Sequence, residues 1–169
     1  ISSVGVYGKN LQGNINETHE LKPMNSYEKS KILADQWLIE LDSKGMEVTI
    51  LRPSVVFDVD MKNNSLKNWV QSIYSGHFFF MGGKKSRVNY VHVEDVKDAI
   101  NAIANKPISK KINIYNLSYS ITVENFVKKI CNNINRAYPR FRAPYLLIIC
   151  AAFLMDFLSM ICNVKFPLT

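Results

Sequence analysis

Blocks of apolar and polar residues along the chain predict strands that alternate with helices. The β-branched run Glu47–Leu51 predicts a buried strand that ends at Pro53. Residues 88–93 and 111–117 predict two more strands. Apolar positions at helical spacing predict helices over residues 26–44, 65–76, 94–105 and 122–135. Strands and helices that alternate in this way are typical of a parallel α/β sheet.

The first residues predict the end of a strand followed by a turn, because glycines punctuate the segment Ser3–Gly8. The chain starts at Ile1, and its first methionine is Met24. We therefore expect an internal piece of a longer protein.

Composition narrows the class of protein. The chain has 169 residues, of which 47% are hydrophobic and 21% charged, as in a folded domain or part of one. Its net charge of +7 is compatible with nucleic acid, anionic lipid or phosphorylated substrates. No aromatic-basic interleaving is present, so we expect no nucleic-acid partner. Three scattered histidines and three cysteines without a CxxC predict no metal site and a reducing, cytoplasmic compartment.

Candidate chemistry begins with Tyr27 and Lys31, which lie four residues apart on a predicted helix and so share a face. A tyrosine is a poor acid or base near neutral pH, but an ammonium group one turn away favours the phenolate. Ser3 lies 24 residues before Tyr27, where its hydroxyl would bond a substrate oxygen. These three groups can move a proton while a hydride goes to or from a nicotinamide.

Four segments support this interpretation because they occur in one order at sensible intervals. They are Ser2–Gly8, Pro23–Lys31, Leu51–Phe57 and Val88–Val96. Together they resemble the extended short-chain dehydrogenase/reductase family, the NAD-dependent epimerases and dehydratases typified by nucleotide-sugar enzymes. The resemblance covers about residues 1–125. It implies an α/β fold class: the C-terminal part of a Rossmann-type doubly wound parallel sheet plus a mostly helical substrate lobe.

The resemblance also implies roles for the catalytic residues. Tyr27 would be the catalytic base or acid, and Lys31 would bond the nicotinamide ribose. Ser3 would hold the substrate hydroxyl or keto oxygen. The implied domains are residues 1–120, the catalytic half with interleaved lobe segments, and residues 121–169, a truncated substrate lobe with an apolar helix.

Further binding residues follow from the same resemblance. Pro53, Ser54 and Val55 would lie against the nicotinamide. Arg87 would bind the substrate diphosphate, with a solvated loop charge as its alternative. The implied partners are a nucleotide-sugar substrate and a second copy of the chain in a homodimer.

The cofactor is expected to be NAD or NADP, but no GxxGxxG motif occurs in the sequence. The phosphate-cradling helix start would then lie upstream of Ile1. We therefore expect the 169 residues alone to bind NAD poorly and to be inactive.

The branch of chemistry stays open between epimerase, dehydratase and reductase. Dehydratases of the family usually add an acid next to the serine position, whereas Val4 follows Ser3 here. The absence of an acid suits an epimerase or a 4-keto reductase, and of these we favour the epimerase. A sterol-type or lipid-linked-sugar dehydrogenase and a non-catalytic NAD(P)-binding homologue are the alternatives.

Residues 145–162 form the most apolar stretch of the chain. One interpretation is a buried helix of the C-terminal lobe or of a subunit contact. The other is a membrane-associated segment, since Arg136, Arg140 and Arg142 precede it as a cytoplasmic flank would.

Overall fold

The computed structural model describes residues 1–9, 13–41, 45–61, 64–105 and 112–144, together with Leu146 and Ile149. The chain divides into two units. The first unit comprises residues 1–62 and 89–120, and the second unit comprises residues 63–88 and 121–169.

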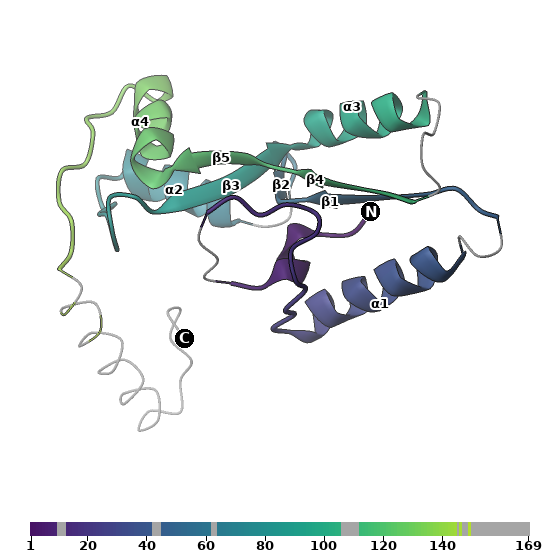
Figure 1. Cartoon of the computed structure of the whole chain (residues 1–169). Helices are drawn as coiled ribbons and strands as arrows, with labels where there is room; N and C mark the ends of the chain where they lie inside the picture. The colour runs from purple at the N-terminus through teal and green to yellow at the C-terminus, as the bar shows by residue number, and fades with distance from the viewer. Residues whose placement is uncertain are drawn as a thin grey trace, which may run out of the picture. The chain divides into compact units, whose positions relative to one another are not determined.

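Parallel strand pairs organise the first unit (Figure 1). Strand β1 (Val48–Pro53) pairs in parallel with β4 (Ile112–Leu117). Strand β2 (Val55–Phe57) pairs in parallel with β3 (Arg87–His92), and β5 (Tyr119–Thr122) lies on the other side of β3. The expected α/β class with parallel strands is confirmed.

Helices cover both sides of the β1–β4 pair, as Figure 1 shows for α1 (Ser26–Glu40) and α3 (Val93–Ala104). The apolar core on the α3 side consists of Leu51, Val91 and Val96. The imidazole Nδ1 of His92 accepts a hydrogen bond from the amide of Glu94 at 3.2 Å and so caps α3.

Strand β1 ends at Pro53, as predicted, and the next residue, Ser54, donates its amide to the carbonyl of Leu117 at 2.8 Å. Strands β2 and β5 were not predicted. They are three and four residues long, too short to show a periodic pattern.

The expected strand end at residues 3–8 is a 3-10 helix, η1 (Val4–Tyr7). The Ser3 side chain caps this helix by accepting from the amide of Gly5 at 3.1 Å. Gly8 ends it with a φ of +90°, a conformation that favours glycine. The hydrogen bond from the Gly5 amide to the Ser3 side chain thus favours a 3-10 helix where a strand end was expected.

Helix α1 covers Ser26–Glu40 of the predicted range, and its buried side is polar. Its buried residues are Glu28 and Asp35, whereas Leu33 and Trp37 are 65% and 63% exposed. Leu33 and Trp37, which are four residues apart, therefore face outward. The other side of the helix packs against polar groups of the first unit.

The second unit contains α2 (Ser65–Tyr74) and α4 (Val123–Asn133). Thr122 caps α4 through its hydroxyl oxygen, which accepts from the amide of Asn125. The core contains Ile73, Phe80, Val127 and Cys131. Burial raises the pKa of the Cys131 thiol above its ordinary value.

Within the part of the chain that the structure describes, no helix is long and apolar enough to span a bilayer. The two interpretations of residues 145–162 concern a segment that lies outside the described residues, apart from Leu146 and Ile149.

Candidate functional site

The segment that carries Ser3 runs beside helix α1. The amide of Ser2 donates to the carbonyl of Leu51 at 2.7 Å, which attaches the segment to β1. The Ser3 hydroxyl oxygen accepts from Gly5, as described above, and the residue is half-buried.

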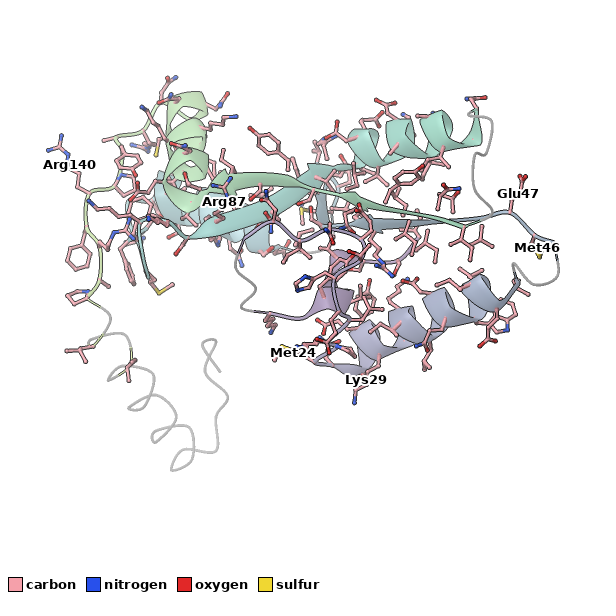
Figure 2. All side chains as sticks on the ribbon, viewed as in Figure 1. Met24, Lys29, Met46, Glu47, Arg87 and Arg140 are labelled. Carbon is pink, nitrogen blue, oxygen red and sulfur yellow. The ribbon has the colours of Figure 1, made fainter. Side chains whose placement is uncertain are left out.

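Tyr27 and Lys31 lie together on α1, as their spacing predicts. The Lys31 ammonium is 5.7 Å from the centroid of the Tyr27 ring. It also donates to the carbonyl of Ile1 at 3.3 Å, which brings it close to the Ser3 segment. Tyr27 is 58% exposed, so its ring is open to a ligand. Lys29 extends away from α1 into solvent, so Lys31 is the cation beside the ring (Figure 2).

The first turn of α1 is fixed by reciprocal capping. The Asn25 side chain accepts from the amide of Glu28 at 2.9 Å, and the Glu28 carboxylate accepts from the amide of Met24 at 2.6 Å. Two otherwise unpaired amides at the helix start are thereby satisfied. Glu28 also lies over Gly5, where an added Cβ would be 3.3 Å from its Cγ. The helix turn that carries Tyr27 is thus attached to the segment that carries Ser3.

A buried polar network lies behind these residues, and sequence reasoning missed it. Oδ2 of Asp35 accepts from Nε of Arg52 at 3.1 Å, from Nη2 of Arg52 at 2.9 Å and from the Ser2 hydroxyl at 3.1 Å. Asp35 and Arg52 are both 2% exposed. The signal in the sequence is the spacing of Asp35, one helical turn after Lys31 and two after Tyr27.

The same network extends to β4. Nη1 of Arg52 donates to the Tyr7 hydroxyl at 2.8 Å, and that hydroxyl donates to the side chain of Asn116 at 2.9 Å. The Glu17 carboxylate accepts from the amide of Asn116 at 2.8 Å. The network therefore joins α1, η1, β1 and β4 through buried or half-buried groups, as a rigid support for the Ser3 segment requires.

The turn Pro53-Ser54-Val55 follows the network along the chain. Ser54 is buried, and its hydroxyl oxygen finds no hydrogen-bond partner among the residues that the structure describes. A buried hydroxyl without a partner is costly, so such a group commonly meets a ligand or water. Val55 is 47% exposed, which leaves an apolar side chain open beside it.

Arg87 belongs to the second unit and is exposed. It lies at the start of β3 (Figure 2). The structure thus places Ser3, Tyr27, Lys31 and the turn at Pro53–Val55 in the first unit and Arg87 in the second. Within the described ranges, no group of three His, Cys, Asp or Glu side chains has the geometry of a metal site.

The groups that the structure places together in the first unit are an exposed phenol and an ammonium on α1. The ammonium also contacts the carbonyl of Ile1, two residues before Ser3.

Comparison with known proteins identifies the family. The sequence pattern of the NAD dependent epimerase/dehydratase family matches residues 1–118. The chain belongs to that family. A search of curated proteins finds no match.

Solved structures show the same Rossmann-like fold at low sequence identity. RMD from Pseudomonas aeruginosa complexed with NADPH is 18% identical, with a TM-score of 0.65 over 85% of this chain and 53% of that one. UDP-glucuronic acid 4-epimerase from Bacillus cereus in complex with NAD is 13% identical, with a TM-score of 0.66 over 84% and 48%. dTDP-glucose 4,6-dehydratase from Bacillus anthracis in complex with NAD is 21% identical, with a TM-score of 0.64 over 83% and 47%. This chain thus spans about half the length of these relatives.

Proposed function

We propose that the chain carries the Ser-Tyr-Lys part of the active site of an NAD(P)-dependent enzyme that acts on a nucleotide sugar. The observation that carries the proposal is the Lys31 ammonium 5.7 Å from the Tyr27 ring centroid, on a helix attached to the Ser3 segment. Residues 1–120 would supply the catalytic part and residues 121–169 the substrate lobe.

The proton chemistry follows from these positions. The Tyr27 phenolate would take the proton of a sugar hydroxyl while hydride leaves the carbon that carries it, and a carbonyl forms there. Ser3 would donate a hydrogen bond to the same oxygen. Lys31 would stabilise the phenolate before the transfer and release this stabilisation as Tyr27 becomes neutral.

The residues present fit the nicotinamide end of the cofactor. NAD or NADP, when bound, supplies the hydride acceptor. The unpartnered hydroxyl of Ser54 and the exposed Val55, after Pro53, offer one polar and one apolar contact for its ring. Lys31 would bond the ribose hydroxyls. The dinucleotide phosphates need a glycine-rich turn that these 169 residues do not contain, so the full-length protein is the form to test.

The substrate proposal rests on Arg87 and on the family. A guanidinium binds a diphosphate through paired hydrogen bonds. The structures of two relatives in complex with UDP-sugars support a nucleotide sugar: a UDP-N-acetylglucosamine 4-epimerase from Methanobrevibacter ruminantium with UDP-N-acetylmuramic acid, and a UDP-glucose 4-epimerase from Thermotoga maritima with UDP-glucose. Among the branches we favour an epimerase, because Val4 supplies no acid beside Ser3.

We further propose a homodimer in which a second copy covers the outer face of α1. Leu33 and Trp37 are exposed on that face, and both are large and apolar. Apolar residues gathered on one face of a helix are typical of a protein interface.

The substitution Tyr27→Phe tests the function in the full-length protein. It removes the hydroxyl that accepts the proton and keeps the ring. We expect kcat to fall by about 10²–10⁴-fold, while the affinity for NAD(P), measured by titration calorimetry, stays within about twofold. Turnover is followed by product analysis with UDP-sugars.

Tyr115→Phe is the matched control, because Tyr115 is also exposed, at 45%, and lies on β4. It should leave kcat unchanged. Full activity of the Tyr27→Phe variant would refute the catalytic role of Tyr27. Absence of turnover in the wild-type protein, with NAD(P) binding retained, would favour the non-catalytic NAD(P)-binding alternative.

A further inference from the structure

One face of α1 carries three ionisable residues at intervals of four: Tyr27, Lys31 and Asp35. On an isolated helix, a lysine and an aspartate four residues apart are neighbours and attract each other. The pattern therefore sets up a competition for Lys31 between the Tyr27 ring and the Asp35 carboxylate.

In the structure Lys31 lies beside the Tyr27 ring, and Asp35 is paired with a different cation. Asp35 receives two hydrogen bonds from Arg52, at 2.9 and 3.1 Å, and both residues are buried. Lys31 instead lies over the Tyr27 ring and donates to the carbonyl of Ile1. Within the described part of the chain, the cation paired with Asp35 is thus Arg52, from a different element.

We propose that Arg52 is a positioning residue that neutralises Asp35 and thereby leaves Lys31 beside Tyr27. The inference rests on the proposed function, because it concerns the residue that tunes the proton acceptor. It gives the buried ion pair a role in chemistry besides its role in holding β1 against α1.

Arg52 is itself held in one orientation, as this role requires. Nη1 donates to the Tyr7 hydroxyl at 2.8 Å, and the guanidinium carbon is 5.2 Å from the centroid of the Tyr7 ring. The planar group thus presents Nε and Nη2 to Asp35 while Nη1 is occupied by Tyr7. A planar, permanently charged fork suits this arrangement better than an ammonium does.

Among the described elements that pack against α1, η1 contributes the ionisable group of Tyr7 and β1 contributes that of Arg52. Besides Tyr27 and Lys31, α1 itself contributes the buried Glu28 and Asp35. The Glu28 carboxylate is occupied by the amide of Met24. Asp35 is therefore the anion for which the loss of Arg52 would matter.

The substitution Arg52→Met would leave a buried carboxylate without its cation. The cation one helical turn away is Lys31, which would move toward Asp35 and away from Tyr27. Formation of the phenolate would then require a higher pH. In the double variant Arg52→Met/Asp35→Asn, the carboxylate is gone as well, so Lys31 should stay beside Tyr27.

The experiment uses the full-length protein with and without cofactor. Tyrosine labelled with carbon-13 at Cζ reports the titration of Tyr27 by NMR in the cofactor-free protein, and the Tyr27→Phe variant assigns the signal. The pH dependence of kcat is measured in parallel. For Arg52→Met we expect both curves to move to higher pH, with about a tenfold loss of kcat at pH 7 and an unchanged KM.

The matched variants separate charge from packing. The double variant should return both curves to those of the wild type, and Arg52→Lys, which keeps the charge, should not move them even where it lowers stability. If Arg52→Met does not fold, Arg52→Gln and Arg52→Gln/Asp35→Asn make the same comparison with a polar side chain.

Two results would overturn the proposal. One is an unchanged Tyr27 titration in the single variant. The other is a double variant whose Tyr27 titration and kcat–pH curve are shifted as far as those of the single variant. That result would mean that Arg52 acts only through packing. Failure of the proposed function is a different result, because activity would then survive Tyr27→Phe whatever the titrations show.

Discussion

Gly8 is the residue at which the backbone leaves the Ser3 segment, and the structure leaves no room there for a side chain. Its φ is +90°, and an added Cβ would lie 2.6 Å from the carbonyl oxygen of Lys22. The amide of Lys22 donates to the carbonyl of Val6 at 2.9 Å, so two segments of the backbone are in direct contact at this point. The position of η1 beside α1 depends on this close backbone approach.

We therefore expect Gly8→Ala to lower the free energy of unfolding by at least about 2 kcal/mol, because it adds a steric clash to an unfavourable φ. Gly13→Ala is the control. Gly13 also has a positive φ, of +83°, but an added Cβ meets nothing within 4 Å. It should cost only about 1 kcal/mol. Urea denaturation of both variants measures the difference, and equal losses would contradict the steric argument.

The sequence allowed part of the site to be predicted at the residue level. Tyr27 and Lys31 are found from spacing alone, because a helix repeats at a known interval. The pairing of Asp35 with Arg52 cannot be found from spacing, because the two residues are seventeen positions apart and lie on different elements. An aspartate in an amphipathic helix is ordinarily assigned to solvent, and only the presence of Arg52 on β1 reverses this assignment.

At the scale of elements, α1 is a helix whose apolar residues are exposed and whose buried residues are polar. Its buried side chains, Glu28 and Asp35, are held by hydrogen bonds, whereas Leu33 and Trp37 face outward. Helices α3 and α4 instead bury apolar residues, Val96 on α3 and Val127 and Cys131 on α4. The fold class could thus be predicted, while the orientation of α1 depended on partners distant in sequence.

The exposed face of α1 makes a prediction about assembly. Leu33→Glu combined with Trp37→Glu would place two carboxylates in the proposed interface, and we expect the full-length protein to become a monomer. Sedimentation velocity measures the change. Ile100→Glu is the control, since Ile100 is 41% exposed on α3 and should leave the mass unchanged. A wild-type monomer, or a dimer that survives the double substitution, would exclude this interface.

At the scale of the whole molecule, charge is divided unequally between the two units. The second unit contains ten Lys and Arg against two Asp and Glu, whereas the first contains eleven against twelve. The second unit, which also contains Arg87, therefore has a net charge of +8, and the first unit has a net charge of −1. A basic surface of this kind attracts phosphates over a distance set by the ionic strength.

This distribution predicts a salt-dependent affinity for the nucleotide part of the substrate. The affinity of UDP, measured by calorimetry on the full-length protein, should fall several-fold between about 0.1 M and about 1 M ionic strength, because the Debye length shortens from about 10 Å to about 3 Å. Uridine, which has no phosphate, is the control and should change little. A UDP affinity that does not respond to salt would show that the second unit's charge does not serve the diphosphate.

The placement of the two tryptophans gives each unit its own fluorescent reporter. Trp37 is 63% exposed on α1, so its emission should be red-shifted and open to aqueous quenchers. Trp69, in the second unit, packs against Phe78 and Phe126 with ring centroids 5.7 and 5.9 Å away. Quencher accessibility can therefore follow each unit separately during unfolding. A binding event that covers α1 would protect Trp37 and leave the signal of Trp69 as an internal reference.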